Sequence, residues 1–392
     1  MNPFEGETSF FLYDLDRLSE RVRELKFSLA SHAKLFYAVK ANALSSIINV
    51  VAAEGIAFDF ASSGELSQLK KSAISFENCI ATGPAKNKLY LSKLLDNDCG
   101  TIVLESINQL KWLNELCLER ECRCDVLLRI QLDWRDSTEQ SVLGGNLITP
   151  FGLHPSDWAK ISLKDFSCLD VLGVHCFQWG NILKPEQLEK VWMATAEASQ
   201  NFSKQMGFSL TVLDLGGGLG VDYVGSSELK VEDVKKLLIQ IKEKFSIPEV
   251  WMELGRFLVA DCGKFYSRVC DLKTVRSQNV AVLESGINHL ARSALTGVGF
   301  PAQVYGSQTT DSLTEARYKL VGPLCTSLDV LGEQALLGAK VGCWIEFSKV
   351  GAYGFSESMP YFLGHDLPGE FVLQDGAIRA IRSYLSAEDY LR

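Results

Sequence analysis

A single lysine follows an apolar run near the start of the chain. Residues 35–39 are apolar throughout, Lys40 comes directly after them, and a helical pattern covers residues 45–54. A run without polar positions is typical of a parallel strand that is covered on both faces. A lysine where such a strand ends is partly desolvated, which lowers its pKa and provides the neutral amine that forms an imine with a carbonyl group. Alone, this pattern more often marks a solvated lysine, so the prediction depends on the residues that accompany Lys40.

Short apolar runs of strand length alternate with helical patterns after residue 34. The eight runs are residues 35–39, 56–60, 78–82, 101–105, 126–130, 170–177, 211–215 and 249–254. Eight strand–helix units over roughly 230 residues are typical of a (β/α)8 barrel of the TIM type, and hence of the α/β fold class. A doubly wound open sheet is the alternative that this pattern leaves open.

The hydrophobic pattern changes on both sides of this region. Residues 10–13 indicate a strand, followed by a helix that Asp14 or Asp16 can cap. The β-like segments after residue 265 are 265–275, 280–283, 341–347 and 370–373. We therefore predict a barrel over residues 31–265 and a mainly antiparallel β domain built from residues 1–30 and 266–392. The strand near residue 10 could pair into that β domain, which would make the barrel an insertion.

Polar residues and glycines stand at the ends of most predicted strands, where the active sites of barrels lie. They are Lys40, Asp59, Glu65, Arg129, His175, Asp214, the glycines 216–218 and 220, Glu253, Gly255 and Arg256. An amine, a flat ring, glycine-bearing turns, an arginine and a carboxylate would thus meet at one mouth. This set suits a flat, phosphorylated cofactor that binds an amine covalently, namely pyridoxal phosphate.

Each of these residues has a chemical role that would suit such a cofactor. Main-chain N–H groups at the triple glycine could approach a phosphate closely, and the N-terminus of a following helix would add its dipole. His175 could stack on the ring, and Glu253 could keep the pyridine nitrogen protonated. The ordinary alternatives are a tight turn for the glycines, a hydrogen-bonded core histidine, and a salt bridge between Glu253 and Arg256.

The bulk composition limits the partners and the compartment. The 392 residues carry a net charge of −9 without a basic block, which argues against nucleic acid and anionic membranes as partners. No apolar stretch approaches the ~20 residues of a membrane helix, and the first residues lack an export signal. The eleven scattered cysteines suit reduced thiols of a cytoplasmic protein. Cys122-x-Cys124 is too closely spaced for the usual zinc knuckle, so we predict no metal site.

Six motifs occur in the order in which a known enzyme family has them. They are YAVKAN, FDFASSGEL, LDLGGGLG, ELGR in place of the usual EPGR, GPLCTSLD and GAYG. The chain resembles the fold-type III pyridoxal-phosphate decarboxylases, the group of the ornithine, arginine and diaminopimelate decarboxylases, over nearly its whole length. The resemblance implies a barrel with a β domain, as in alanine racemase, and an enzyme that removes the α-carboxylate of an amino acid.

The resemblance also implies roles for individual residues. Lys40 would hold the cofactor covalently, His175 would stack on its ring, and Glu253 would bind the pyridine nitrogen. The implied phosphate ligands are Gly217, Gly218, Gly255, Arg256 and Tyr353, and the other cofactor residues are Asp59, Glu65 and Arg129. Cys325 would enter from the partner subunit and protonate the substrate carbon, so a homodimer with shared active sites is expected. Without its motif, Cys325 would be interpreted as a small buried hydrophobe.

Two departures from the family pattern concern the substrate. Thr326 stands where diamine-forming members carry an acidic residue, and residues 291–297 lack the aspartate of the corresponding segment. A buried ammonium without an acidic partner is costly, which argues against a free basic amino acid. The chain looks more like the branch that serves siderophore and other secondary-metabolite pathways. There Arg292 and His289 could meet the extra carboxylates of a citryl-linked diamino acid, beside Cys325 and Thr326.

Other functions stay open at this point. A diaminopimelate or basic amino-acid decarboxylase is the nearest alternative. An amino-acid racemase of the alanine-racemase type shares the architecture but places an arginine at the pyridine nitrogen, so Glu253 argues against it. A non-catalytic relative that binds a partner protein is the third, and the presence of Lys40 and Cys325 argues against that. In a further departure, Gln178 could replace a serine that contacts phosphate in relatives.

Overall fold

The computed structural model describes residues 6–133, 149–225, 229–306 and 315–391. The described chain forms two compact units. The first comprises Arg21–Asp222 and Ser226–Leu258, and the second comprises Met1–Glu20, Tyr223–Gly225 and Val259–Arg392. The boundaries between the two units fall at 20/21, inside α1 (Leu15–Leu29), and at 258/259, inside α9 (Arg256–Val259). Both lie before the predicted domain boundaries, which are 30/31 and 265/266.

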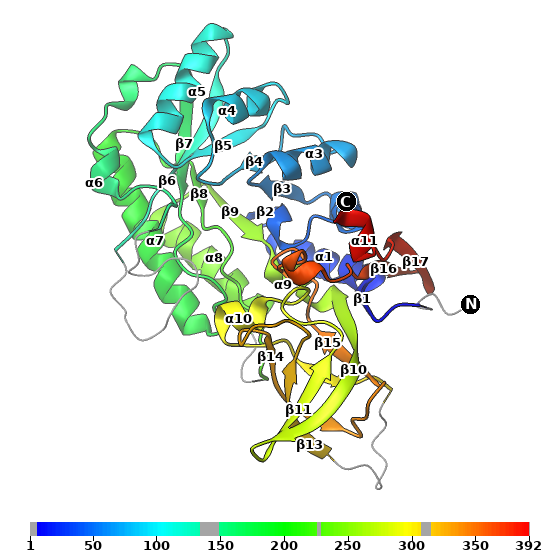
Figure 1. Cartoon of the computed structure of the whole chain (residues 1–392). Helices are drawn as coiled ribbons and strands as arrows, with labels where there is room; N and C mark the ends of the chain where they lie inside the picture. The colour runs from blue at the N-terminus through cyan, green and yellow to red at the C-terminus, as the bar shows by residue number, and fades with distance from the viewer. Residues whose placement is uncertain (1–5, 134–148, 226–228, 307–314, 392) are drawn as a thin grey trace. The chain divides into compact units, whose positions relative to one another are not determined.

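The first unit contains a closed barrel of parallel strands (Figure 1). Its strands are β2 (Lys34–Ala38), β3 (Ala57–Phe60), β4 (Ile80–Ala81), β5 (Thr101–Leu104), β6 (Cys124–Arg129), β7 (Leu169–His175), β8 (Val212–Asp214) and β9 (Glu249–Leu254). Every predicted run overlaps one of these strands. The barrel closes because β9 pairs with β2, with Glu253 beside Phe36. The predicted (β/α)8 barrel is therefore confirmed, and the open sheet is excluded.

Helices follow most of the barrel strands. They are α2 (Ser45–Ala53), α3 (Ser63–Lys71), α4 (Lys88–Leu95), α5 (Ile107–Glu119), α6 (Pro155–Trp158), α7 (Pro185–Met206) and α8 (Val231–Phe245). Side-chain caps fix where four of them begin. Ser62, Asn87, Ser106 and His154 each accept a hydrogen bond from a main-chain N–H in the first turn. Such a cap satisfies an N–H group that has no partner within the helix.

Six strands send an apolar side chain into one layer of the barrel interior. The layer consists of Phe36, Ile80, Val103, Leu127, Val212 and Trp251, all of them buried. The ring centroids of Phe36 and Trp251 lie 5.1 Å apart. Burying each such side chain stabilises the fold by roughly 1.5–3 kcal/mol. This packing holds the strand ends, and the polar residues on them, in place.

The second unit contains a nine-stranded, mainly antiparallel sheet. Its strands are β1 (Ser9–Asp14), β10 (Gly263–Val275), β11 (Gln278–Leu283), β12 (Ala302–Val304), β13 (Glu315–Val321), β14 (Val330–Leu337), β15 (Trp344–Ser348), β16 (Gly369–Gln374) and β17 (Ala377–Arg382). Strand β1 pairs antiparallel with β10 and parallel with β16, so the barrel is an insertion, as predicted. Asp14 caps the following helix, since its Oδ1 accepts a hydrogen bond from Arg17 N at 2.9 Å.

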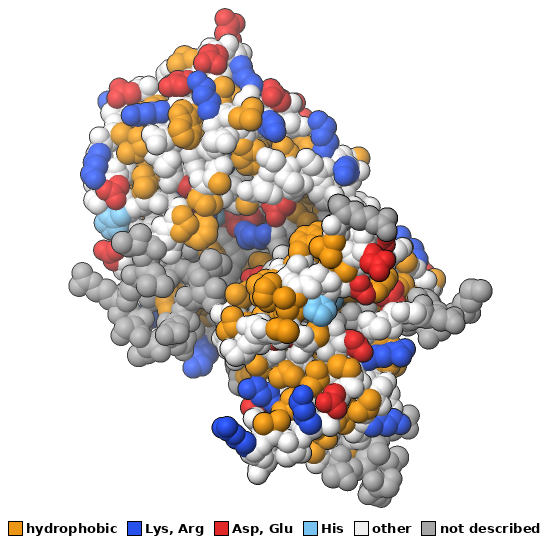
Figure 2. Space-filling view, in the orientation of Figure 1, with side chains coloured by type: hydrophobic (Ala, Val, Ile, Leu, Met, Phe, Trp, Pro, Cys, Tyr) orange, Lys and Arg blue, Asp and Glu red, His pale blue; other side chains and the backbone are white. Residues whose placement is uncertain are grey.

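Charged side chains of both signs are interspersed over the face that Figure 2 shows. Among the residues that the structure describes, none of the helices combines the length and the apolar composition needed to cross a membrane.

Candidate active site

Lys40 lies in a short 3₁₀ turn, Val39–Ala41, directly after β2. Its Nζ is 2.8 Å from Asp59 Oδ2 and 3.6 Å from Glu253 Oε2. The lysine side chain is 44% exposed, whereas the side chains of Asp59 and Glu253 are 1% and 5% exposed. The amine is therefore accessible to a ligand while two buried carboxylates from neighbouring strands hold it in position.

Asp59 orients this lysine. Its second oxygen, Oδ1, accepts a hydrogen bond from Thr82 Oγ1 at 2.6 Å. Burial and the nearby Glu253 raise the pKa of Asp59, and the Lys40 ammonium opposes this shift. Asp59 thus contacts the Lys40 amine. Its contact with the cofactor stays a prediction.

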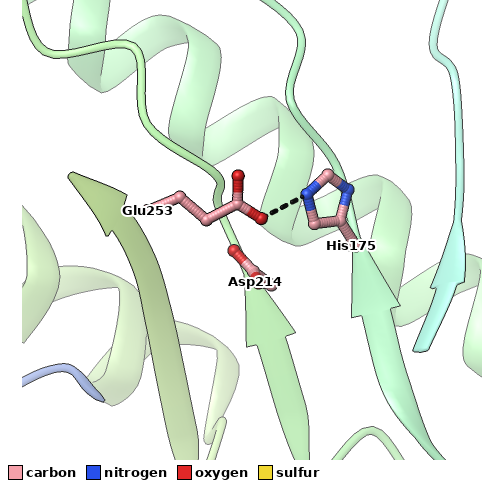
Figure 3. Close-up of side chains that lie close together, drawn as sticks. All are labelled: His175, Asp214 and Glu253. Atoms are coloured by element: carbon pink, nitrogen blue, oxygen red, sulfur yellow. Dashed lines mark hydrogen bonds and ion pairs between the residues drawn. The ribbon is translucent and has the colours of Figure 1, made fainter. Parts of the chain in front are cut away.

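His175, Asp214 and Glu253 form a cluster at the carboxyl ends of β7, β8 and β9 (Figure 3). Nε2 of His175 is 2.9 Å from Oε1 of Glu253, and the histidine is 1% exposed. Burial, followed by the Arg129 guanidinium, lowers the pKa of His175 well below its ordinary value, so the ring is neutral. Because a carboxylate only accepts, the ring donates from Nε2, and its buried Nδ1 has no hydrogen-bond partner among the residues that the structure describes.

Asp214 provides a second buried polar atom that has no hydrogen-bond partner in the described part of the chain. Its Oδ1 accepts a hydrogen bond from Gly216 N at 2.8 Å, whereas no described residue bonds to Oδ2. Burial and the Glu253 carboxylate raise the pKa of Asp214 well above its ordinary value, which favours the protonated carboxyl group. One ligand atom from each of the three residues lies within 4.8 Å of the others. A cation would suit these donors, but the Lys40 ammonium 3.6 Å from Glu253 would repel it.

Replacing Asp214 with asparagine is expected to stabilise the protein near neutral pH, because an amide mimics the protonated carboxyl group, whereas the unfolded chain has already released the Asp214 proton at this pH. We expect the free energy of unfolding of Asp214→Asn to exceed that of the wild type, and Asp214→Ala to be roughly 1–3 kcal/mol less stable than Asp214→Asn because it loses the acceptor of the Gly216 N–H. Urea denaturation near neutral pH measures both values. If Asp214→Asn were as destabilising as Asp214→Ala, the carboxyl group would be ionised in the folded protein.

The triple glycine lies against the main chain of β9. Glu253 N donates to Gly216 O at 2.8 Å, and a Cβ on Gly217 would lie only 2.6 Å from Glu253 O. Gly218 has a φ of +93°, which L-residues rarely adopt. These glycines therefore let the turn approach Glu253 closely. The helix that follows them, α8 (Val231–Phe245), begins only at Val231, so its predicted dipole contribution at the glycines stays a prediction.

Two further predicted phosphate ligands, Gly255 and Arg256, are half-buried at the end of β9, where Arg256 begins α9. Their phosphate contacts stay predictions. The suggestion that Gln178 replaces a phosphate ligand is not supported. Its amide oxygen accepts from Leu132 N at 3.2 Å, and its amide nitrogen donates to Leu132 O at 2.9 Å.

Glu65 fixes the turn after β3 through a capping box. Its Oε2 accepts a hydrogen bond from Ala61 N at 2.7 Å, while Ser62 Oγ accepts one from Glu65 N at 3.2 Å. These bonds determine where α3 begins and how β3 ends. Glu65 therefore stabilises the end of β3, the strand that carries Asp59.

Arg129 belongs to a buried ionic group whose other members the sequence analysis missed. Its Nη1 is 3.1 Å from Glu105 Oε1, and Lys86 Nζ is 3.5 Å from the same oxygen. Glu105 Oε2 also accepts a hydrogen bond from Gly152 N at 3.2 Å. Burial tends to raise the pKa of Glu105, but Arg129 and Lys86 outweigh it and lower the pKa. Burial lowers the pKa of Lys86 to about 8.

A simple signal could have found both missed residues. Glu105 follows β5 directly, and Lys86 lies shortly after β4. Both therefore lie at the carboxyl ends of barrel strands, as the predicted site residues do. The pairing itself joins separate strands of the barrel and leaves no local pattern in the sequence.

The depressed pKa of Lys86 predicts a dependence of stability on pH. Its ordinary pKa is 10.5, so between pH 8 and 10.5 the unfolded chain binds this proton more tightly than the folded chain. The wild type should therefore gain stability relative to Lys86→Met as pH rises through this window, by roughly 1.4 kcal/mol per pH unit at most. Urea denaturation at pH 7.5 and 10 measures the gain. Lys93→Met is the control, because Lys93 is an exposed lysine on α4. An equal difference between wild type and Lys86→Met at both pH values would contradict the prediction.

His289 is a buried histidine of the second unit. It is 2% exposed, its Nδ1 is 2.9 Å from Ser285 Oγ, and its Nε2 is 3.1 Å from Asp366 O. Burial, above all, lowers the pKa of His289 to about 3, so the ring is neutral. Both ring nitrogens have partners inside the unit. These contacts do not support the predicted role of His289 in binding a substrate carboxylate.

Arg292, the other predicted carboxylate ligand, begins α10 (Arg292–Thr296) and is 5% exposed. Its guanidinium carbon lies 4.0 Å from the ring centroid of Tyr223. This stacking fixes the plane of the guanidinium group. Its contact with substrate stays a prediction.

Cys325 is an exposed free thiol, so its interpretation as a buried hydrophobe is wrong. Asp329 holds its loop, because Oδ1 accepts from Ile287 N at 2.8 Å and Oδ2 accepts from Leu324 N at 2.7 Å. Thr326 Oγ1 accepts a hydrogen bond from Leu328 N at 3.3 Å within the same turn. Tyr353 is half-buried with a φ of +54°, and its phosphate contact stays a prediction.

The barrel, with an amine and a buried carboxylate–histidine cluster at its carboxyl end, defines a lysine-dependent enzyme of the pyridoxal-phosphate class. A family model for the pyridoxal binding domain of pyridoxal-dependent decarboxylases matches residues 15–260. The chain therefore belongs to this family. Its members are carboxy-lyases that use pyridoxal phosphate.

Individual relatives cover most of the chain. Diaminopimelate decarboxylase of Bacillus subtilis is 30% identical and aligns with 90% of this chain and 84% of its own length. L-glutamyl-[BtrI acyl-carrier protein] decarboxylase of Niallia circulans is 25% identical, over 98% of this chain and 92% of its own. The fold is similar to that of diaminopimelate decarboxylase from Helicobacter pylori complexed with L-lysine. That similarity has a TM-score of 0.87 at 24% identity and covers 98% of this chain and 96% of that one.

The described residues fit the cofactor. The accessible Lys40 amine can bind its aldehyde, and the close approach of the glycine turn to β9 leaves no room for a Cβ on Gly217. Within the described ranges, His175 Nδ1 and Asp214 Oδ2 are buried polar atoms without hydrogen-bond partners beside Glu253. Such atoms are unusual in a folded protein and are typical of a binding site.

Proposed function

We propose that this enzyme removes the α-carboxylate of an amino-acid conjugate, of the citryl-linked diamino-acid type, in siderophore biosynthesis. It would act in the cytoplasm as a homodimer with shared active sites. The observation that carries the proposal is the loop of Cys325. Thr326 replaces the acidic residue there, and both oxygens of Asp329 already accept main-chain hydrogen bonds. Neither residue offers a carboxylate to the ammonium of a free diamino acid.

Each candidate site residue would have one role in this reaction. Lys40 would hold the cofactor, and His175 and Glu253 would fix its ring from the stacking face and the nitrogen side. Gly217, Gly218, Gly255, Arg256 and Tyr353 would bind its phosphate. When bound, pyridoxal phosphate supplies an electron sink for the electron pair that remains on Cα after carbon dioxide leaves. Cys325 Sγ of the partner subunit would then give a proton to that carbon.

The relative from Niallia circulans supports a substrate that is joined to another group, because its name describes a glutamyl unit on an acyl-carrier protein. Arg292 would meet an additional carboxylate of the conjugate. The similarity to diaminopimelate decarboxylases favours a second candidate, a free diamino acid. A racemase is a weaker candidate, because Glu253 and not an arginine belongs to the site cluster.

A panel of substrates tests the proposal. The purified enzyme, loaded with pyridoxal phosphate, is offered free ornithine, lysine and diaminopimelate and the corresponding citryl-linked amino acids. Carbon dioxide release and product mass are followed. We expect kcat/KM to be at least tenfold higher for a conjugate. Faster turnover of a free diamino acid would overturn the proposed substrate, and racemised product without carbon dioxide would overturn decarboxylation.

A further inference from the structure

A cavity of about 680 Å³ lies at the amino-terminal ends of β2, β3 and β9. Lys34, Ala57 and Glu249, the first residues of these three strands, line it. Lys40 and the other candidate active-site residues lie at the opposite ends of the same parallel strands. One strand length, about 15 Å, separates the two ends. The cavity is therefore distinct from the site described above, and its volume is typical of small-molecule sites.

Lys34 places a partly buried ammonium group in this cavity. Its Nζ lies 4.7 Å from the ring centroid of Trp251 and 5.1 Å from that of Phe36. Both rings belong to the inner layer of the barrel, so the stem of this half-buried lysine is fixed by packing. No hydrogen bond or ion pair joins its ammonium to another residue in the described part of the chain.

The acid of the cavity does not neutralise Lys34 by contact. Glu249 lines the cavity, but its Oε2 accepts a hydrogen bond from Trp251 Nε1 at 3.0 Å. Burial lowers the pKa of Lys34, and Glu249 opposes the shift only in part. A desolvated ammonium over two aromatic faces is stabilised by an anion that enters from the open side.

The charged groups of the remaining lining are mostly basic. Lys26, Lys242 and His32 add basic groups, against the one acid Glu249, in a chain whose net charge is −9. Lys26 already donates to Glu54 O at 2.5 Å, so Lys34 and Lys242 are the lysines that can face a ligand. Ser31, Ser75 and Asn78 add uncharged polar groups, and apolar side chains line much of the wall, among them Ala33, Leu35, Ala52, Ile56, Phe58 and Ile74.

We propose that this cavity binds a small amphipathic carboxylate, with its head at Lys34 and Lys242 and its apolar chain against the aliphatic wall. Charge complementarity selects the carboxylate, since the free positive charges exceed the single acid. The aliphatic wall selects an apolar chain over a compact polar anion. This inference concerns binding at the amino-terminal end of the barrel and does not depend on the substrate of the decarboxylase.

Isothermal titration of the full-length enzyme with octanoate tests the proposal. We expect saturable binding with one site per chain, and at least tenfold weaker binding of the uncharged analogue octanamide. Lys34→Met keeps an apolar stem on the aromatic rings and should weaken octanoate binding at least tenfold. Lys242→Gln should weaken it severalfold.

Lys244→Gln is the matched control, because Lys244 lies on α8 as Lys242 does but is exposed and does not line the cavity. It should change the affinity less than twofold. The proposal is overturned if octanoate shows no saturable binding to the wild type, or if octanamide binds equally well. It is also overturned if folded Lys34→Met binds octanoate as the wild type does. The comparison of octanoate with octanamide uses the wild type alone, so it stands even if a variant fails to fold.

Discussion

Lys40→Ala is expected to abolish the visible absorbance of bound pyridoxal phosphate and to reduce decarboxylation by roughly 10²–10⁴-fold. Lys40 supplies the accessible amine of the barrel mouth, and the two carboxylates beside it fix its position. The variant would lose both the covalent attachment of the cofactor and a nearby group that can transfer protons. Absorbance spectra and single-turnover carbon dioxide release of the variant loaded with cofactor measure the two losses separately.

The same variant has a structural consequence with a definite sign. Removing the ammonium leaves Asp59 and Glu253 as neighbouring buried carboxylates, and burial already raises the pKa of Asp59. A carboxyl group whose folded pKa is raised stabilises the fold at low pH, and that stability is lost as pH rises through the folded pKa. Lys40→Ala should therefore be closer to wild-type stability at pH 5 than at pH 8. Lys71→Ala, an exposed lysine of α3, is the control for both measurements. Retention of the absorbance band would contradict the assignment of Lys40.

The barrel could be predicted from the sequence because its strands are buried on both faces. Such strands are continuous apolar runs, as in Thr101–Leu104, where every residue is buried. The strands β12, β13, β14 and β17 were not predicted, although they belong to the sheet of the second unit. Ala377–Arg382 is almost entirely exposed, and Glu315–Val321 alternates exposed and half-buried positions with charged residues. An edge or half-exposed strand is determined by its neighbours more than by its own residues.

The meeting of Lys40, His175 and Glu253 could be predicted because parallel strands bring their carboxyl ends to one mouth. The pKa values of the clustered groups could not be predicted. The lowered pKa of His175 and the raised pKa of Asp214 depend on burial and on charges from other strands. His289 shows the same limit, since a histidine with two internal partners looks no different in sequence from one that faces a ligand. Sequence patterns locate strand ends, whereas the closed barrel and the packed sheet determine which polar atoms remain available.

Glu253→Gln is expected to lower kcat by roughly 10²–10³-fold with a smaller effect on KM. In the proposed function, Glu253 holds a proton at the pyridine nitrogen and so strengthens the electron sink at the moment when carbon dioxide leaves. Glutamine has the same shape and can still bond to His175, but it cannot carry the negative charge that keeps the nitrogen protonated. Because the interaction matters most in the transition state, its loss should appear in kcat.

The protein offers a matched control on the same strand. Glu249 begins β9 and is exposed at the opposite end of the barrel, so Glu249→Gln should keep kcat within about twofold. A second readout is independent of turnover. The Glu253 carboxylate contributes to the raised pKa of Asp214, so its removal should lower that pKa. The stability gained by adding Asp214→Asn should accordingly grow less between pH 5 and pH 8 in the Glu253→Gln variant than in the wild type, because a carboxyl group with a lower folded pKa stops losing stability once the pH passes that pKa. If Glu253→Gln kept kcat within threefold of the wild type, the carboxylate would not act on the cofactor nitrogen. The argument against a racemase would then lose its support.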